Sequence, residues 1–442
     1  MFSSDEEAFL DDLQQRGIRF FMDEADPVSG LMPDRAKANG GPANNVSSTA
    51  SVGFGLTALC VGVERGWVPK QEAYDRSLRV LKFLRDKMPN HHGHFFHFID
   101  MRTGERVWNS EVSNIDTALL MAGVLCVRQY YPDTELAKVA DELWQRVDWP
   151  WLLDKNIGGL MCMGWKPEGG PVKTDAPGSE AQAEEGTFLT AHWGAYSEGP
   201  PLIHLLGIGS KSHPLPAESW GAWKREPVMT FAGLTFIQCP PLFTHQYPQC
   251  WFDLRGLRDE QANYFRNSRL ATIAQRQWTI DVLSKRYETY GPNVWGVTAS
   301  DGPDGYKAWG GPEPDGKYDR DINGVVVPCA SAGSLAFEPR LCIDVLKNLK
   351  ARYAEKGWRK YGFVDALNPR TGWYNEDVIG IDVGPTVLMA ENARSGFVWK
   401  LFMSTPEAQA AVKAAGLRAD GKAGMMQPNT ALVGAAAPAG KR

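Results

Sequence analysis

The sequence predicts a mostly α-helical protein that folds as a single domain. Apolar residues recur at helical spacing in many separate segments, and several segments are apolar on nearly every face, which is typical of buried helices. No linker or shift in composition divides the 442 residues. Long loops rich in Gly, Pro and Asp separate the helices, and such loops are uncommon unless they build a site.

The composition excludes several classes of protein. With 43% hydrophobic and 22% charged residues and a net charge of −5, the chain resembles an ordinary globular protein, and nothing basic indicates nucleic-acid binding. No apolar run reaches the roughly 18 residues of a membrane span. The start lacks the features of a signal peptide, so we expect a cytoplasmic protein, or a periplasmic one if a leader was removed. The sequence does not indicate an oligomeric state.

Helical periodicity and its breaks predict the order of the elements. Residues 94–108 change to a strand period around Thr103–Gly104 and predict a β-hairpin, whereas 210–253 and 290–328 read as irregular. We expect one domain over residues 1–417 and a poorly ordered tail over 418–442. Helices are predicted at 5–25, 47–63, 69–87, from about 114, at 133–148, 195–208, 258–287, 337–356, 384–403 and 406–415.

Three glycines lie inside the predicted helix 47–63. Gly53, Gly55 and Gly62 each cost about 1 kcal/mol of helix stability relative to Ala. Their presence indicates that another helix packs very close to this one.

Two acidic residues occupy matching positions in the chain. Glu198 and Asp382 each precede a Gly-Pro step and an apolar helix, and glycoside hydrolysis needs one protonated carboxyl and one ionised carboxylate. A helix N-terminus favours the anion, so Asp382 suits the base role. The aromatic and apolar neighbours of Glu198, Tyr196 among them, predict a raised pKa and the acid role. The simpler alternative is that both acids only neutralise helix dipoles.

Two further acids follow the predicted hairpin. Ser113-x-x-Asp116 fits a capping-box-like helix start, which gives Asp116 a structural explanation. Glu111 has no such explanation and, close to Trp108, is a candidate for lining a sugar site. The 16 Trp residues fit core burial and stacking on sugar rings equally well.

The candidate metal patterns are weak. Asp319-x-Asp321-x-Asn323-Gly324 matches the front half of an EF-hand loop, but its twelfth position is Ala330 and not a bidentate Glu. The histidines between His91 and His97 follow a strand period, which favours surface and core positions. Seven cysteines without a CxxC pair indicate neither a disulfide framework nor zinc. We therefore predict no metal and no cofactor.

Five separated motifs, taken together, resemble the glycoamylase-like domain family, which includes bacterial endo-β-1,2-glucanases of glycoside hydrolase family 144. The similarity covers residues 5–416. The motifs are Ile115-Asp116-Thr117-Ala118-Leu119-Leu120, Trp251-Phe252-Asp253-Leu254-Arg255-Gly256-Leu257-Arg258-Asp259, Tyr290–Pro303, Ile381-Asp382-Val383-Gly384-Pro385 and Phe397–Met403.

The resemblance implies an (α/α)6 barrel whose site lies in the loops at one end, where we also expect the small β-hairpin. It implies cleavage of β-1,2-glucan to short sophorooligosaccharides. Family members carry carboxylates at positions matching Glu111, Asp116, Glu198 and Asp382, and two departures are Val383, where glutamine is expected, and the Gly-Pro-Pro after Glu198. The proposed subsite or supporting residues are Tyr196, Trp295, Asp253, Arg255, Asp301 and Trp108.

The main prediction is a metal-independent glycoside hydrolase acting on β-1,2-glucan. Glu198 is the acid candidate and Asp382 the base candidate, with Glu111 and Asp116 as alternates for the base. We favour inversion, for which the two carboxyls lie about 6.5–9.5 Å apart, against about 5–5.5 Å for retention. The alternatives are a transglycosylase that uses the same site, and an inactive glucan-binding protein.

Overall fold

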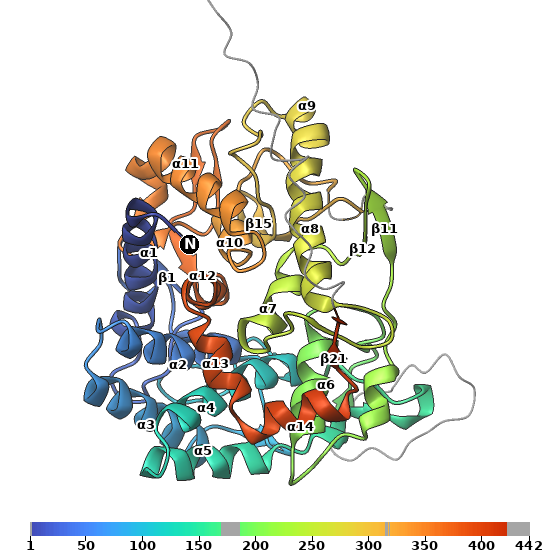
Figure 1. The fold of residues 1–442 in the computed structure, drawn as a ribbon. Coiled ribbons are helices and arrows are strands. Elements are labelled where there is room, and N and C mark those ends of the chain that lie inside the picture. The colour runs from blue at the N-terminus through green and yellow to red at the C-terminus, as the bar shows by residue number, and fades with distance from the viewer. Residues whose placement is uncertain (1, 169–185, 314–316, 318, 422–442) are drawn as a thin grey trace, which may run out of the picture.

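The computed structural model describes residues 2–168, 186–313, 317 and 319–421. Within them, six helices form a closed inner ring (Figure 1): α2 (Thr49–Glu64), α4 (Asn114–Tyr130), α6 (Gly199–Gly209), α7 (Phe243–Trp251), α10 (Pro328–Ala332) and α12 (Gly380–Arg394). Neighbours pack against one another around the ring, and the Gln246 amide of α7 donates a hydrogen bond to the Ala330 carbonyl of α10 at 2.8 Å. The predicted (α/α)6 barrel is confirmed.

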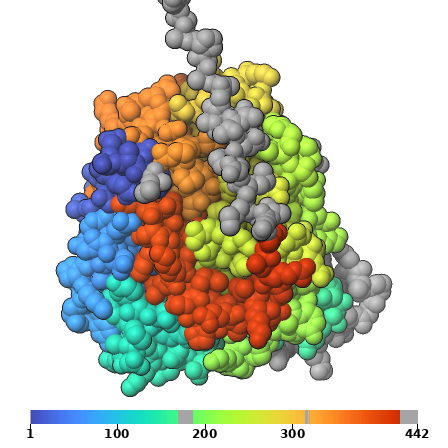
Figure 2. Space-filling view, viewed as in Figure 1, coloured from blue at the N-terminus to red at the C-terminus, as the bar shows by residue number. Residues whose placement is uncertain are grey.

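An outer helix covers each inner helix. Four of the six outer helices follow their inner partner directly in the chain. The other two inner helices, α12 and α6, are covered by the first helix of the chain and by α14 (Pro406–Ala414) near its other end. In Figure 2 this C-terminal segment lies between the cyan and green parts of the surface. The other outer helices are α1 (Ser4–Asp23) on α12, α3 (Lys70–Asp86) on α2, α5 (Glu135–Arg146) on α4, α8 (Tyr264–Trp278) on α7 and α11 (Pro339–Gly357) on α10.

Sequence explains which helices lie inside. Residues Thr49–Gly62 of α2 and all of α6 are buried, as their all-round apolar pattern requires. The outer helix α5 instead buries one apolar stripe and exposes its charged face. In the part of the chain that the structure describes, no helix combines the length and apolar character needed to cross a membrane.

Short strand pairs fasten the loops at the N-terminal ends of the inner helices. Strands β2 (Val46–Ser48), β6 (Val112–Ser113) and β20 (Asp377–Ile379) run directly into α2, α4 and α12, and pair with β5 (Phe98–Asp100), β9 (Gly164–Lys166) and β1 (Arg35–Lys37). The remaining pairs are β3 (Asn90–His91) with β4 (His94–Phe95), β7 (Leu153–Asp154) with β8 (Leu160–Met161), β10 (Thr187–Phe188) with β9, β11 (Val228–Phe231) with β12 (Leu234–Ile237), β13 (Leu257–Arg258) with β21 (Arg418–Ala419), β14 (Ala299–Gly302) with β15 (Gly305–Ala308), β16 (Trp358–Arg359) with β17 (Gly362–Phe363), and β18 (Leu367–Asn368) with β19 (Trp373–Tyr374).

The predicted hairpin over 94–108 is present, but it is shorter than expected. Strand β5 turns back near Thr103–Gly104, and the return reaches only a single bridge between Arg106 and Ile99. The earlier part, β4, pairs with β3 instead. Because β5 also pairs with β2, the hairpin is tied to the loop that enters α2.

Three segments differ from the sequence prediction. The stretch 210–253, predicted irregular, contains the inner helix α7, whose aromatic residues and internal Pro248 hide its helical character. The helix expected from 258 begins at Tyr264, because Asp259 turns the chain by accepting the N–H groups of Gln261 and Ala262; it continues through a π-helical turn (Thr279–Leu283) into α9 (Ser284–Arg286).

The third difference is the helix expected over 384–403. It is two helices, α12 and α13 (Phe397–Met403), separated at Gly396, whose φ of +68° breaks the helical path. Helix α12 also begins earlier than predicted, at Gly380, so Asp382 lies inside its first turn.

The start of the predicted tail is ordered. Strand β21 pairs with β13, so regular structure continues past residue 417, while residues 422–442 of the predicted tail lie outside the described residues. The single domain over 1–417 stays a prediction, and the packing of α14 on α6 supports it.

Glycines allow α2 and α4 to touch backbone to backbone. A Cβ added at Gly53 would lie 2.2 Å from the Leu119 carbonyl oxygen, and one at Gly123 would lie 2.2 Å from that of Gly53. The predicted close approach is thus confirmed for Gly53. At Gly55 and Gly62 a Cβ would instead meet the side chains of Phe21 and Val68.

We predict that Gly123→Ala destabilises the protein, although Ala is normally the better helix former. The added methyl group must separate two helices whose backbones are in contact, and such overpacking costs about 1–3 kcal/mol. Urea unfolding followed by circular dichroism measures this. Gly221→Ala, with open space around its Cβ, is the control, and equal stability of both variants would contradict the close packing.

Candidate active site

Carboxyl and thiol groups gather where the inner helices begin. Asp116 and Asp382 are third residues of α4 and α12, Cys329 is the second residue of α10, and Glu198 occupies the N-cap position of α6. The first N–H groups of a helix lack partners within the helix and carry partial positive charge. This end of the ring therefore favours anions.

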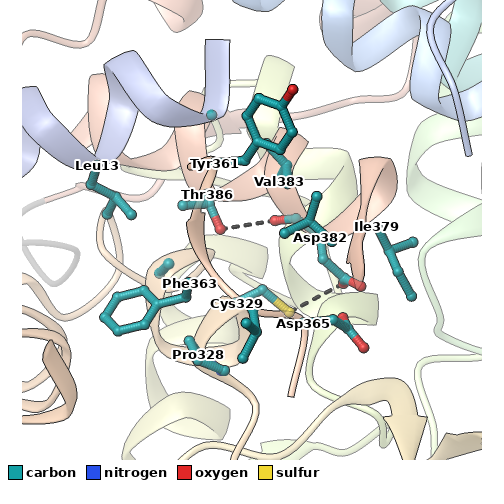
Figure 3. Close-up of a pocket in the computed structure, with 14 residues that line it drawn as sticks. Leu13, Pro328, Cys329, Tyr361, Phe363, Asp365, Ile379, Asp382, Val383 and Thr386 are labelled. Atoms are coloured by element: carbon teal, nitrogen blue, oxygen red, sulfur yellow. Dashed lines mark hydrogen bonds between the residues drawn. The ribbon is translucent and has the colours of Figure 1, made fainter. Parts of the chain in front are cut away.

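Asp382 is almost fully buried. Only 6% of the residue is exposed, and its Oδ1 accepts a hydrogen bond from the Cys329 thiol at 3.1 Å. The carboxyl of Asp365 lies beside it (Figure 3). Burial raises the pKa of Asp382 to about 6, while burial and the neighbouring Asp382 raise the pKa of Asp365 well above its ordinary value.

Pro385 links α12 to α7. It lies inside α12 and has no N–H, so the carbonyl of Ile381, four residues earlier, loses its helical donor. The Tyr247 hydroxyl of α7 donates to that carbonyl at 2.9 Å. Pro385, near the start of the helix predicted over 384–403, thus creates an acceptor that ties the first turn of α12 to its neighbour.

Glu198 is half-buried and has few partners. The Ser197 hydroxyl donates to its carboxylate, and burial, with a smaller contribution from the charge of Asp116, raises the pKa of Glu198. Burial raises the pKa of Tyr247, and the charges of Asp382 and Glu198 add to this effect. The carboxyls of Asp382 and Glu198 therefore both lie within electrostatic range of the Tyr247 hydroxyl, although they belong to two different inner helices.

A histidine joins the other two predicted acids. Nδ1 of His97 lies 3.1 Å from Glu111 Oε1, and Nε2 lies 3.6 Å from Asp116 Oδ1. Burial opposes protonation of His97, but Asp116 and Glu111 outweigh it and raise its pKa to about 9. Asp116 also accepts from the Ser113 hydroxyl at 2.6 Å, and that hydroxyl caps the helix by accepting from the Asp116 N–H, which is one half of the predicted capping box.

This trio is the one group in the described part of the chain whose ligand atoms could surround a metal ion, all lying within 4.8 Å of one another. However, each ring nitrogen of His97 faces a different carboxylate, which is the arrangement of a bridging imidazolium. We therefore interpret the trio as a charge cluster. Elsewhere, Asp319 and Asp321 of the partial EF-hand pattern face Arg286 and Lys307.

A charged network connects the two halves of the site. Arg35 on β1 pairs with Asp34 at 3.1 Å and with Asp301 on β14 at 2.8 Å. Burial raises the pKa of Asp34, while the charges of Arg35 and His97 act in the opposite direction. Asp34 thus lies within electrostatic range of the His97 cluster on one side and of Asp301 and Asp382 on the other.

Comparison with known proteins agrees with this architecture. Residues 190–406 match the glycoamylase family model, described as "Putative glucoamylase". The crystal structure of a "putative glucoamylase" from Bacteroides caccae is 30% identical to this chain, with a TM-score of 0.80, and the match covers 94% of this chain and 100% of that one. The chain belongs to the glycoamylase-like family.

Two further relatives are named for a specific glucan. The endo-β-1,2-glucanase of Chitinophaga pinensis, solved with sophorotriose and glucose, is 29% identical with a TM-score of 0.81 over 95% of this chain and 99% of that one. An exo β-1,2-glucooligosaccharide sophorohydrolase of Parabacteroides distasonis is 28% identical over 92% of this chain. The present chain spans only 58% of the length of that second relative.

Several predicted binding residues are buried or already paired with other side chains. Asp253 and Arg255 follow the C-terminal end of α7, where they pair at 2.7 Å and Arg255 covers the ring of Trp399. Trp295 is fully buried, so its ring has no free face for a sugar. Tyr196 is buried, with its hydroxyl 3.1 Å from His245 Nδ1.

Trp108 and Asp301 lie closer to the acids. Trp108 is 61% exposed and packs edge-on against Phe98, which stacks on His97 at a centroid distance of 3.8 Å. Asp301 accepts from Arg35 and, at 3.0 Å, from the side-chain amide of Asn375. Trp108 therefore offers a free ring face, while Asp301 is already paired.

Sequence reasoning missed residues that complete the site. Asp365, Cys329 and Tyr306 come from loops and short elements that carry no helical or strand periodicity of their own. Tyr306 on β15 exposes 49% of its surface, while burial of its hydroxyl end and the charge of Asp382 raise its pKa. The one feature of the sequence that could have indicated Asp365 is that it is an isolated acid within a short apolar run.

We predict that His97→Asn destabilises the protein most at low pH. Since the folded pKa of about 9 exceeds the unfolded value of roughly 6.5, the stabilisation is fully present below about pH 6.5 and is lost as pH rises through 9. Melting temperatures of both proteins from pH 6 to pH 10 measure this. The exposed His213→Asn is the control, and a pH-independent difference would contradict a charged His97.

Proposed function

We propose that this protein is a glycoside hydrolase that cleaves β-1,2-glucan to short sophorooligosaccharides. The observation that carries the proposal is the pair Glu198 and Asp382, held at the starts of two inner helices and each with a raised pKa. Two carboxyls of different protonation are what glycoside hydrolysis requires. The names of the C. pinensis and P. distasonis relatives support β-1,2-glucan as the substrate.

The surroundings of the two carboxyls suit different roles. Glu198 is half-buried and accepts a hydrogen bond from the Ser197 hydroxyl, and burial raises its pKa, so it suits the acid role. Asp382 receives the Cys329 thiol in the first turn of α12, and with a pKa of about 6 it is mostly ionised at neutral pH. It therefore acts as the base.

The proposed step is a single displacement. Glu198 gives its proton to the glycosidic oxygen as the bond from that oxygen to the anomeric carbon breaks. A water molecule attacks the same carbon from the opposite side, and its proton passes to Asp382, directly or through a sugar hydroxyl. The anomeric configuration inverts, and both carboxyls return to their starting states by proton exchange with solvent.

Other residues are assigned to substrate binding. Glu111 and Asp116 remain alternates for the base, but their ion pairs with His97 favour a role in accepting hydrogen bonds from sugar hydroxyls. The exposed rings of Trp108 and Tyr306 are the proposed stacking platforms.

Product length distinguishes the proposal from its alternatives. The two named relatives comprise one endo-acting and one exo-acting enzyme of similar identity to this chain. Mixed short oligosaccharides indicate endo action, and sophorose alone indicates exo action. Longer or cyclic chains would indicate a transglycosylase, and binding without any product would indicate a glucan-binding protein.

We predict that Glu198→Gln and Asp382→Asn each reduce hydrolysis of linear β-1,2-glucan by at least about 10²-fold, since each removes one proton-transfer group. Product size by chromatography and the anomer of the new reducing end by NMR measure this, with the α-anomer expected for wild type.

The exposed Glu218→Gln and Asp344→Asn are matched controls that should keep full activity. Loss in only one of the two site variants would move the missing role to Glu111 or Asp116. Wild-type cleavage of amylose or another glucan, with β-1,2-glucan untouched, would overturn the substrate.

We predict that Trp108→Ala raises KM about three- to tenfold while changing kcat little, because stacking binds ground state and transition state alike. Initial rates over a range of sophorooligosaccharide concentrations measure this. Trp108→Tyr keeps a ring and should restore most of the affinity. An unchanged KM in Trp108→Ala would remove Trp108 from the binding surface.

A further inference from the structure

Asp365 and Asp382 share a small cavity behind the candidate base. The cavity, of about 30 Å³, lies between α1, α10 and α12, and apolar side chains such as Leu13 and Val383 form most of its wall. Figure 3 shows the two carboxyls side by side at its edge. Asp365 and Asp382 are 4% and 6% exposed, so neither has bulk water to stabilise a charge.

Two buried carboxyls in contact cannot both be ionised. Ionised carboxylates only accept hydrogen bonds, so two carboxyls that lie side by side away from water can bind one another only if one of them carries a proton. Asp365 Oδ1 and Asp382 Oδ2 are also both buried without any other partner in the described structure. One shared proton satisfies both atoms.

The donors around each residue show which one carries the proton. Both donors to Asp365, the Asp301 N–H at 2.8 Å and the Asn375 amide at 3.2 Å, bind its Oδ2. This is the pattern of a neutral acid, whose carbonyl oxygen accepts and whose hydroxyl donates. Asp382 instead accepts a hydrogen bond from the Cys329 thiol and lies in the first turn of α12, where the helix favours an anion.

We propose that Asp365 is a positioning residue that remains protonated and donates its carboxyl hydrogen to Asp382, holding Asp382 as an oriented carboxylate. The proposal rests on the base role of Asp382 in the proposed function. During the reaction Asp365 keeps its proton, and Asp382 alone gains one from the attacking water. Cys329 supports the same carboxylate from α10 through its thiol.

Other charged and titratable groups face this pair from every neighbouring element. Their combined electrostatic effect on the pKa of Asp382 is the same in wild type and in each variant. A difference between the variants therefore comes from the change at Asp365. They are Asp34 before β1, Arg35 on β1, Asp301 on β14, Tyr306 on β15, Tyr247 on α7 and Cys329 on α10.

The decisive comparison is between Asp365→Asn and Asp365→Ala. An Asn amide donates a hydrogen bond as a protonated carboxyl does, so we expect kcat/KM on β-1,2-glucan within about threefold of wild type and an unchanged acid limb of the pH profile. Ala removes the donor, so we expect at least about a tenfold loss and an acid limb displaced to higher pH by roughly one unit.

Two results would overturn the proposal. Inactivation of Asp365→Asn to the level of Asp382→Asn would mean that Asp365 acts as a carboxylate. Displacement of its acid limb to lower pH would mean that a negative charge had been removed. If Asp365→Ala does not fold, Asp365→Asn alone still gives these outcomes.

A measurement without substrate separates this proposal from the proposed function. A protonated Asp365 has a raised pKa, so wild type loses stability relative to Asp365→Asn as pH rises above the unfolded value of about 3.9. We expect the melting temperature of Asp365→Asn minus that of wild type to increase from pH 4.5 to pH 8, with the exposed Asp344→Asn as control. A flat or falling difference would overturn the shared proton, even if wild type cleaves no glucan.

Discussion

The convergence of inner-helix N-termini at one end of a closed ring is the constraint on which the site depends. Removing a carboxylate from water costs several kcal/mol, and this protein places Asp34, Asp116, Asp365 and Asp382 in buried positions close together. Helix starts supply fixed partial positive charge that does not have to reorganise. Two full cations, Arg35 and His97, pair with Asp34 and Glu111, which lie outside the helix starts, and His97 also faces Asp116.

The same arrangement makes the two candidate catalytic carboxyls unequal. Both occupy helix starts and both are desolvated, so neither property alone separates an acid from a base. The difference lies in the side-chain donors among the described residues, because Asp382 has the Cys329 thiol and, in our proposal, the Asp365 carboxyl, whereas Glu198 has the Ser197 hydroxyl. Hydrogen bonds to the charged form stabilise it, which favours the anion at Asp382 and the neutral acid at Glu198.

Features with a local cause were predictable from sequence. The all-round apolar character of α2 and α6, the close approach at Gly53, and acids at the starts of α6 and α12 all follow from residues near one another in the chain. What sequence could not supply was pairing over long separations. Asp365 meets Asp382 because the strands and turns between them fold back, and the Asp301 N–H, 64 residues earlier in the chain, donates to Asp365.

Membership in a family motif did not by itself identify residues close to the carboxyls. Asp253 and Arg255 belong to a motif that carried the family resemblance, yet the chain reaches them only after leaving α7 at its C-terminal end. All the carboxyls of the site lie at the other end of the ring. Hydrophobic periodicity does not show which end of an inner helix faces the site. That end separates the residues that build the site from the residues that support the barrel.

The separation of the two carboxyls is set by contacts from remote parts of the chain. Glu198 is placed by α6, whose outer partner α14 is the last helix of the described chain. The two helices pack so closely that a Cβ added at Gly209 would lie 2.4 Å from the Glu407 carbonyl oxygen. Asp382 is placed by α12, whose first turn is fixed by Tyr247 of α7 at the carbonyl that Pro385 leaves free. The distance between acid and base is therefore defined only when the ring has closed and the C-terminal helix has docked. A chain that stopped before α14 would keep both carboxyls and lose the packing that fixes one of them relative to the other.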